Sequence, residues 1–326
     1  MNNWIVMGDS FQAWHNLAVE EALFERLLPG QCIFYLWQNQ NTVVIGRHQN
    51  AWKECRVKLL EEEYGYLARR SSGGGAVFHD LGNLNFTFVM PRPSYDVRRQ
   101  LEVIQRAVAE FGIEAAFTGR NDLVVTASGA KFSGNAFRFS ETVGMHHGTI
   151  LVNVDMEKLG RYLAPGKEKL RAKGIESVRS RVCNLTEYSP QMTIPALIEA
   201  LGRAFVSTYG PAEPLDMAEL DQNRLAILEQ KYDSWEFRMG HALPFDVTFE
   251  HRFDWGGVSL ELSLREGQIV RVQVFSDAMD EAMIDRIAPA LTGIRYENSA
   301  IAAALRTLNH VQADQMADWL FEQELG

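Results

Sequence analysis

The segment from Arg69 to Asp80, which reads RRSSGGGAVFHD, limits the possible folds more than any other part of the chain. Around consecutive glycines the backbone amides can approach a ligand closely, because no Cβ stands in the way. Such amides bind anions, and two adjacent arginines add hydrogen bonds that suit phosphate. Apolar residues at 76–78 and 85–89 flank the glycines. We therefore expect an anion-binding loop between two buried strands, with a flexible surface turn as the alternative.

The two familiar nucleotide-binding glycine motifs do not fit this segment. A P-loop requires Gly-Lys-Ser/Thr after its glycines, whereas Gly75 is followed by Ala76 and Val77. A dinucleotide-binding fingerprint requires glycine or alanine at the position that Phe78 occupies. We therefore expect another kind of loop to hold the phosphate.

A second candidate segment combines Gly119-Arg120-Asn121-Asp122-Leu123 with Lys131, which lies among the small residues of 129–134. Just after an expected strand, a lysine can reach a phosphate or carboxylate as a point charge. A solvated lysine in a hairpin loop is the alternative, since lysines are usually exposed. Asp122 is a candidate Mg²⁺ ligand, because one carboxylate together with phosphate oxygens commonly holds this ion. A turn residue or strand cap is the other interpretation of Asp122.

Two further clusters permit both structural and functional interpretations. His146 and His147 are adjacent, but no HExxH motif and no third ligand at metal-binding spacing accompany them. We expect a histidine packed beside a cleft rather than a metal site. Glu20 and Glu21, near the start of an expected helix, suit either a functional role or the helix dipole. Trp37 fits a pocket wall and an apolar core equally well.

The charge distribution indicates two units with different surfaces. The whole chain carries a net charge of −10, of which residues 246–326 contribute −8 and the first 245 residues −2. A nucleic-acid-binding protein normally needs a basic footprint, so this class is disfavoured. One stretch, Lys167 to Arg181, reverses the trend with six basic residues against two acidic ones. It is either a solvated face or a surface that docks an acidic partner or closes over a phosphate.

Length and cysteine content narrow the class of protein further. A chain of 326 residues suggests two domains, and 46% hydrophobic residues are enough for a sizeable core. Three cysteines without CxxC spacing (Cys32, Cys55 and Cys183) indicate neither a disulfide framework nor a zinc site. The chain shows no signal-peptide pattern and no apolar run long enough for a membrane span. We expect a soluble, reduced, cytoplasmic protein.

Hydrophobic periodicity predicts an α+β fold with two domains, 1–244 and 245–326. In the first domain we expect helices at 14–28, 97–111 and 194–205, and strands at 4–7, 32–37, 42–45, 123–126 and 149–153. The mostly polar and helical stretch from Pro211 to Pro244 is the candidate linker. In the second domain we expect strands at 247–253, 258–264 and 269–275, followed by helices at 278–287, 299–308 and 312–320. This pattern predicts a small α+β C-terminal domain.

In their order along the chain, these segments resemble the lipoate–protein ligase A family. The similarity rests on residues 69–83, 119–123, 131–134 and 146–149, and 16–21, 43–47 and 177–181 also match. It covers roughly residues 1–210, and the C-terminal part is similar in place and size to the accessory domain of the long members. The resemblance implies a catalytic core of mixed β-sheets flanked by helices, of the kind shared with biotin protein ligases and class II aminoacyl-tRNA synthetases.

The resemblance also implies an activity. The family activates lipoate with ATP and Mg²⁺ to lipoyl-AMP, then transfers the lipoyl group to a specific lysine of an acceptor domain as an amide. The implied partners are lipoyl domains of 2-oxoacid dehydrogenase E2 subunits and the glycine cleavage H protein. We expect a monomer that binds neither nucleic acid nor membrane.

Residue roles follow from the family's motifs. Lys131 is the expected catalytic residue, contacting both the α-phosphate and the acyl carbonyl. The other expected ATP-binding residues are Arg70, Gly75, Ala76, Val77, Phe78, Asn83, Asn121 and Asp122, with Asp122 also the expected Mg²⁺ ligand. The expected lipoate-binding residues besides Lys131 are Glu20, Trp37, Ser71, Gly74 and His79.

Two alternatives stay open at this point. Related octanoyltransferases need no ATP and pass the acyl group through a cysteine thioester, for which Cys183 is the candidate here. A small packed side chain is the other interpretation of Cys183. A non-catalytic regulator that binds an acyl-adenylate or a nucleotide is an alternative of another class. The residues also leave open the preference between lipoate and octanoate, the acceptor served, the general base for amide formation and the movement of the accessory domain.

Overall fold

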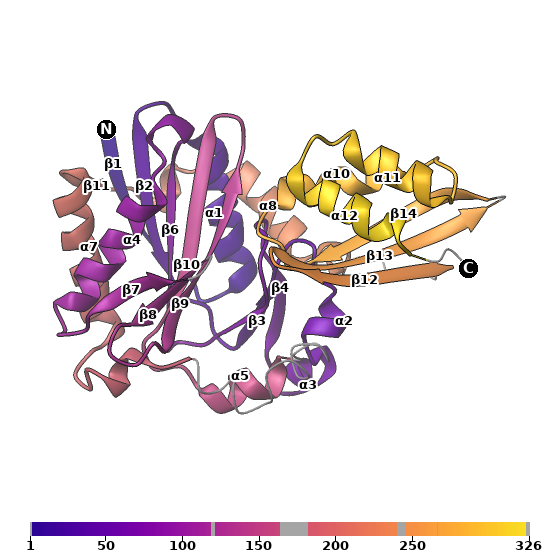
Figure 1. Ribbon diagram of the computed structural model, residues 1–326. Helices are drawn as coiled ribbons and strands as arrows, with labels where there is room; N and C mark the ends of the chain where they lie inside the picture. The colour runs from indigo at the N-terminus through magenta and orange to yellow at the C-terminus, as the bar shows by residue number, and fades with distance from the viewer. Residues whose placement is uncertain (1, 119–120, 164–181, 240–245, 266, 324–326) are drawn as a thin grey trace.

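An eight-stranded mixed sheet organises the N-terminal part of the chain in the computed structural model (Figure 1), which describes residues 2–118, 121–163, 182–239, 246–265 and 267–323. The strand order is β11-β1-β2-β6-β10-β9-β8-β7. β11, β1 and β2 run parallel, and each pairing from β2 to β7 is antiparallel. The strands are β1 (Asn2–Met7), β2 (Gln31–Trp37), β6 (Asn83–Pro91), β7 (Ala115–Thr118), β8 (Asp122–Val125), β9 (Lys131–Phe139), β10 (Val143–Leu151) and β11 (Ala212–Pro214).

Helices cover both faces of this sheet. On one face lie α4 (Val97–Ala109) and α7 (Ile194–Tyr209), which share a core with β2 and β6. On the other face lie α1 (Ala13–Arg26) and α8 (Gln222–Asp233), which share a second core with the same strands. The apolar residues of α4 recur every three or four positions, and the Asp96 side chain caps its first amides, so this helix forms as its sequence predicts.

A second, smaller sheet carries the glycine-rich segment. Its order is β4-β3-β5, from β3 (Thr42–Ile45), β4 (Tyr66–Arg69) and β5 (Val77–His79). The glycines connect β4 to β5, so the loop lies between two strands as expected. A third core packs this sheet against α2 (Ala51–Glu54), α3 (Val57–Glu62) and α5 (Met156–Tyr162).

The C-terminal part is a three-stranded antiparallel meander with helices on one face (Figure 1). Its elements are β12 (Val247–Phe253), β13 (Gly256–Arg265), β14 (Gln268–Ser276), α10 (Glu281–Leu291), α11 (Asn298–Arg306) and α12 (Val311–Phe321), and they enclose a core of their own. The small α+β domain is therefore present as predicted. The predicted boundary at 244/245 lies within residues 240–245, outside the described residues.

The C-terminal domain packs directly against the glycine-rich segment. The Gly74 amide donates to the Ala278 carbonyl over 3.0 Å, and the Ser276 amide donates to the His48 carbonyl over 2.7 Å. An ion pair of 3.0 Å between Arg47 and Asp285 adds to the contact. Residues of the C-terminal domain therefore contact the glycine-rich loop and the neighbouring residues 47–48 directly.

The expectation of a linker at 211–244 is wrong for its described residues. β11 extends the large sheet, and α8 buries Leu225, Leu228 and Tyr232 beside α1. The expected helical character is confirmed by α8, and the linker role is wrong because apolar residues three and four apart give this helix a narrow buried face. The shorter helices are α9 (Trp235–Met239) and the 3₁₀ turns η1 (Arg92–Ser94), η2 (Leu185–Glu187) and η3 (Met217–Glu219).

Among the described residues, no helix combines the length and the apolar character that crossing a bilayer requires.

Candidate active site

A pocket of about 130 Å³ opens between the large sheet and the small one. Residues of β2, β6, β9 and β10 form one wall, and β3 with the glycine-rich segment forms the other. It is lined by Leu17, Trp37, Val44, Arg70, Gly74, Gly75, Ala76, Val77, His79, Asn85, Asn121, Lys131, Gly134, Asn135, Ala136, His147, Gly148 and Thr149. Apolar side chains and convergent polar groups together are typical of a small-molecule site.

The two adjacent arginines have different roles. Arg69 donates to carbonyls of Gly46, Gln49 and Phe237, among others, and thereby ties loops together away from the pocket. Arg70 lines the pocket and donates to the carbonyls of Gly73 and Gly75, which holds the glycine loop in shape. Burial lowers the pKa of both guanidinium groups to about 10, so both remain charged at neutral pH.

The glycines leave the loop backbone open where a ligand can approach. Gly74 has a φ of +88°, a conformation that side-chain-bearing residues rarely adopt. A Cβ at Gly75 would meet no atom within 4 Å, so this stretch of backbone faces free space. Beside Arg70, the backbone of residues 75–77 is therefore the part of the loop that can accept an anion.

Lys131, the first residue of β9, reaches the same pocket. Its ammonium lies 2.6 Å from Asp122 Oδ1 in an ion pair, and both side chains are about one-third exposed. The lysine side chain crosses above Gly134, where an added Cβ would lie 2.9 Å from Nζ. Because Gly134 has no side chain, the ammonium can lie at the pocket wall instead of extending into solvent.

A chain of buried hydrogen bonds supports the inner wall of the pocket. Arg70 Nε donates to Ser72 Oγ, whose hydroxyl lies 2.7 Å from His147 Nε2. His147 Nδ1 in turn lies 2.7 Å from Glu20 Oε1. Each group in this chain thus donates a hydrogen bond to the next, from the Arg70 guanidinium to the Glu20 carboxylate.

A second chain ends on the same carboxylate oxygen. Trp37 Nε1 donates to Thr87 Oγ1 over 3.1 Å, and Thr87 Oγ1 donates to Glu20 Oε1 over 2.6 Å. Glu20 therefore fixes both Trp37 and His147 in the wall. The expectation that Glu20 and Glu21 lie near a helix start is wrong, since α1 begins at Ala13 and both carboxylates are buried further along it.

The adjacent histidines point to opposite faces of the large sheet, because successive strand residues alternate. His147 faces α1 and the pocket, whereas His146 faces α4, where Nδ1 lies 2.7 Å from the Gln100 side-chain amide. Nε2 of His146 lies 2.8 Å from the amide of Asn135, which also bonds the Asn121 carbonyl. The pair therefore does not converge on one ligand.

Most of the predicted site residues meet at this pocket. Those that line it are Arg70, Gly74, Gly75, Ala76, Val77, His79, Trp37, Asn121 and Lys131. Asp122 and Glu20 contact lining residues without lining the pocket themselves. Three others lie further away: Ser71 and Asn83 are buried outside the lining, and the Phe78 ring packs with Tyr162 in the third core.

Sequence reasoning did not single out several of the pocket residues. Asn85, Asn135 and Thr149 line the pocket from three neighbouring strands, and the Asn135 side chain itself turns to His146 on the opposite face of the sheet. Asn85 lies between Leu84 and Phe86 in β6, and a polar residue between apolar strand residues is a signal that could have marked it. No strand was predicted for residues 131–139, so the position of Asn135 in β9 was missed.

The predicted basic stretch Lys167 to Arg181 and the motif residues Gly119 and Arg120 lie outside the described residues. Among the described residues, no group of three or more His, Cys, Asp or Glu side chains could hold a metal ion. The single carboxylate of Asp122 therefore provides one Mg²⁺ ligand at most, and phosphate oxygens would have to supply others.

Comparison with known families identifies the chain. Residues 12–206 match the lipoyl protein ligase A/B catalytic domain, and residues 242–320 match the C-terminal domain of bacterial lipoate protein ligases. The chain belongs to the lipoate–protein ligase family. It is a long member, because it carries the C-terminal domain as well as the catalytic one.

Solved structures agree with this assignment. P. falciparum LipL1, crystallised in complex with lipoate, is 27% identical, and the match covers 99% of this chain and 100% of that one with a TM-score of 0.87. A bipartite lipoate protein ligase from Thermoplasma acidophilum, studied with its E2 lipoyl domain, is also 27% identical, with 76% and 100% coverage and a TM-score of 0.67. A lipoate-protein ligase A bound with ATP is 25% identical, with 74% and 99% coverage and a TM-score of 0.64.

Proposed function

We propose that this protein is an ATP-dependent lipoate–protein ligase, which forms lipoyl-AMP and then transfers the lipoyl group to a lysine of a lipoyl domain. The observation that carries this proposal is one pocket that joins an apolar wall, an open glycine loop held by Arg70, and the ammonium of Lys131. The pocket therefore offers sites for an acyl chain, for phosphate and for a reacting carbonyl.

The first half-reaction needs fixed positive charge. A lipoate carboxylate oxygen attacks the α-phosphorus of ATP, the bond to the β-phosphate oxygen breaks, and pyrophosphate leaves. Anionic groups approach one another in this step, so Arg70, the amides of residues 75–77 and Lys131 lower its barrier. Mg²⁺ bound to the phosphates would neutralise further charge, with Asp122 as its candidate protein ligand.

The second half-reaction uses the ammonium of Lys131 in another way. The neutral amine of the acceptor lysine attacks the acyl carbon, the bond from this carbon to the phosphate oxygen breaks, AMP leaves, and the nitrogen releases one proton to water. Lys131, placed beside the mixed anhydride, donates a hydrogen bond to the developing oxyanion. We propose that acceptors are lipoyl domains of the E2 and H-protein type, which reach Lys131 from the open side of the pocket.

The alternative of a cysteine-dependent octanoyltransferase is disfavoured by the surroundings of Cys183. Its side chain is 2% exposed and packs in the core beneath α4 and α7, on the opposite face of the large sheet from α1 and the pocket. Sγ lies 3.6 Å from the Ala130 carbonyl oxygen. Burial raises the pKa of the thiol to about 11, so a thiolate nucleophile is scarce at neutral pH.

Pyrophosphate release tests this proposal. With lipoate and Mg-ATP the wild-type protein should release pyrophosphate, and Lys131→Ala should lower the rate by about 100-fold, the usual effect of removing one preorganised donor. Cys183→Ala should retain the wild-type rate within a few-fold. No lipoate-dependent pyrophosphate, together with Cys183-dependent acyl transfer from a thioester donor, would establish the octanoyltransferase instead. Nucleotide binding without either reaction would indicate a non-catalytic nucleotide-binding regulator.

A further inference from the structure

His79 is a buried polar group that the reaction steps above do not use. It lines the pocket beside Trp37, with the two rings edge to face and their centroids 6.3 Å apart. The residue is 3% exposed, and its Nε2 atom has no hydrogen-bond partner. Burial is the main cause that lowers the pKa of this imidazole to about 3, so the ring is neutral at pH 7.

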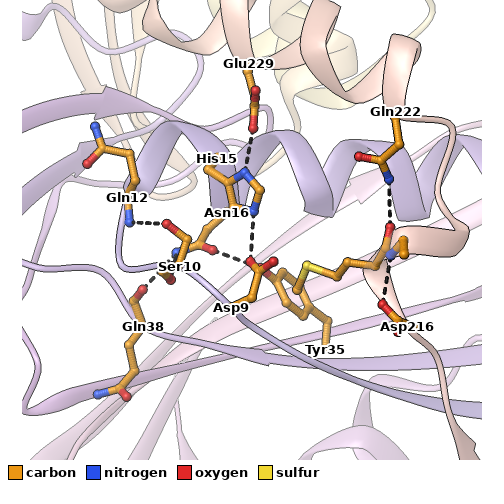
Figure 2. Close-up of polar contacts among 12 residues, drawn as sticks. Asp9, Ser10, Gln12, His15, Asn16, Tyr35, Gln38, Asp216, Gln222 and Glu229 are labelled. Atoms are coloured by element: carbon orange, nitrogen blue, oxygen red, sulfur yellow. Dashed lines mark hydrogen bonds and ion pairs between the residues drawn. The ribbon is translucent and has the colours of Figure 1, made fainter.

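A chain of side-chain amides determines which nitrogen of His79 carries the proton. Figure 2 shows its beginning, where Asn16 Nδ2 donates to the backbone carbonyls of Ser10 and Gln38 over 2.9 and 2.8 Å. Only an NH₂ group can bond two carbonyl oxygens, so the orientation of this amide is fixed. Asn16 Oδ1 accordingly accepts from the Tyr35 hydroxyl, as Figure 2 also shows.

The next link transfers this orientation to the histidine. Asn16 Nδ2 shares one of its two hydrogens with Asn39 Oδ1, 3.0 Å away, which turns Asn39 Nδ2 toward His79 Nδ1, 3.1 Å away. Nδ1 must then accept a hydrogen bond. In a neutral imidazole the other nitrogen bears the proton, so Nε2–H is a buried donor without a partner, in a side chain that lines the pocket.

We propose that His79 Nε2–H is a specificity-determining donor for the dithiolane end of lipoate, and that Asn16 and Asn39 position it. The inference rests on the proposed function. The His79 ring contacts Trp37, and Trp37, Leu17 and Val44 give the same pocket apolar lining against which an acyl tail can be buried. A dithiolane sulfur accepts a hydrogen bond there, whereas the alkyl tail of octanoate leaves the donor buried and unsatisfied.

The first test uses the wild-type protein. With ¹⁵N-labelled histidine, NMR should show His79 as the Nε2–H tautomer at pH 7, both free and with lipoate bound. The Nε2 proton should shift on addition of lipoate and not on addition of octanoate. An Nδ1–H tautomer, or equal shifts with both acids, overturns the proposal.

The second test compares affinities and rates of adenylation for lipoate and octanoate. His79→Leu should lower the lipoate-to-octanoate ratio by about tenfold, because octanoate no longer leaves a donor unpaired. His79→Gln, which keeps an N–H donor, should retain most of the ratio. His146→Leu is the matched control, because it removes a buried histidine from the opposite face and should leave the ratio unchanged.

The outcomes separate the inference from the proposed function. If wild type activates both acids and His79→Leu leaves their ratio unchanged, the donor role of His79 is wrong and the ligase assignment stands. If the wild-type protein binds and activates neither acid, the ligase assignment fails and the inference fails with it. Affinity is measured without ATP from the fluorescence of Trp37 and the other tryptophans, so a variant with impaired chemistry still reports on selectivity.

Discussion

Gly134 decides where the ammonium of Lys131 can lie. The Lys131 side chain passes over this glycine to reach Asp122, whose Cα is the cross-strand partner of Gly134. A methyl group at this position would contact Nζ at 2.9 Å and Cε at 3.1 Å. Lysine can evade it by rotating outward, so the fold tolerates the change while the ammonium leaves the pocket wall.

We therefore expect Gly134→Ala to reduce pyrophosphate release by about 10- to 100-fold, the effect of misplacing one preorganised donor. Thermal unfolding should shift by no more than a few degrees. Gly202→Ala is the control, since a Cβ there meets no atom within 4 Å and the position is inside α7. That control should be fully active and slightly more stable. Full activity of Gly134→Ala would contradict the placement of Lys131.

At the residue scale, the sequence predicted segments that meet at the pocket, but not which of two adjacent identical residues faces it. Arg69 and Arg70 are identical in type, and their roles separate only because successive strand and loop residues face different sides. The same applies to Ser71 and Ser72, of which Ser72 contacts His147. Motifs identify a neighbourhood, whereas the side that a residue faces depends on strand register.

At the scale of elements, β10 connects the core of the catalytic domain to its pocket. His146 bonds the side-chain amides of Gln100 on α4 and Asn135 on β9, and the histidine itself is fully buried. Asn135 in turn holds the Asn121 backbone, which lies beside Lys131 in the pocket lining. Helix α4 is thus coupled to the lysine-bearing strands through one buried imidazole.

We expect His146→Leu to lower the free energy of unfolding by about 2–4 kcal/mol, because two buried amides lose their partner. Gln100→Leu should cost less than this. In the double variant the two effects should not add, since Leu at both positions removes the unpaired amide of Gln100, and the coupling should reach about 1 kcal/mol. Urea unfolding of the four proteins measures this cycle, and strict additivity would contradict the proposed contact.

Most elements were predictable because their hydrophobic periods are clear. The helices α1, α4 and α7 and all three strands of the C-terminal sheet occur where alternation or helical spacing places them. β4 and β9 were missed. β4 has only four residues of mixed character, whereas β9 is interrupted by Gly134 and Asn135, which line the pocket. Pocket residues break the local pattern, so sequence reasoning is weakest there.

At the scale of the whole molecule, the contact between domains is a close fit of backbone against backbone. A Cβ at Gly73 would lie 2.3 Å from the Ala278 carbonyl oxygen, and no side chain there can move to relieve the clash. Gly73 has no positive φ, so alanine adds no backbone strain of its own. The glycine is required by the neighbouring domain and not by the loop.

Gly73→Ala should therefore displace the C-terminal domain while leaving the hydrophobic cores of both domains intact. Hydrogen exchange should accelerate at the amides of Gly74 and Ser276, which donate across the interface. Protection within β13 and within α4 should not change, because these elements lie in separate cores. Unchanged exchange at Gly74 and Ser276 would show that the interface does not depend on this fit.

Four groups with large pKa shifts make stability depend on pH in the weakly acidic range. Burial lowers the pKa of His48 to about 4 and that of His79 and His146 to about 3, and it raises the pKa of Glu281 to about 7. Below pH 6.5 the unfolded chain binds protons on these histidines that the folded protein does not, so acid destabilises the fold. Glu281 acts oppositely between pH 4.5 and 7, because its folded form holds the proton.

Three histidines against one glutamate leave a net uptake of about two protons on unfolding between about pH 5 and pH 6. The free energy of unfolding should fall by up to about 2.7 kcal/mol per pH unit on acidification. Glu281→Gln removes the opposing group and should steepen the fall to about 4 kcal/mol per pH unit. Urea unfolding at fixed ionic strength measures both slopes. A variant slope equal to or shallower than that of wild type would contradict the assignment.

The activity assigned to the whole molecule is tested most directly by the mass of its product. A purified lipoyl domain is incubated with this protein and free lipoate, with and without Mg-ATP, and its intact mass is measured. We expect a gain of one lipoyl group only when ATP is present, and no gain with Lys131→Ala under the same conditions. A gain without ATP, or none with ATP when an acyl thioester donor succeeds, would contradict the ligase and assign the pocket to acyl transfer.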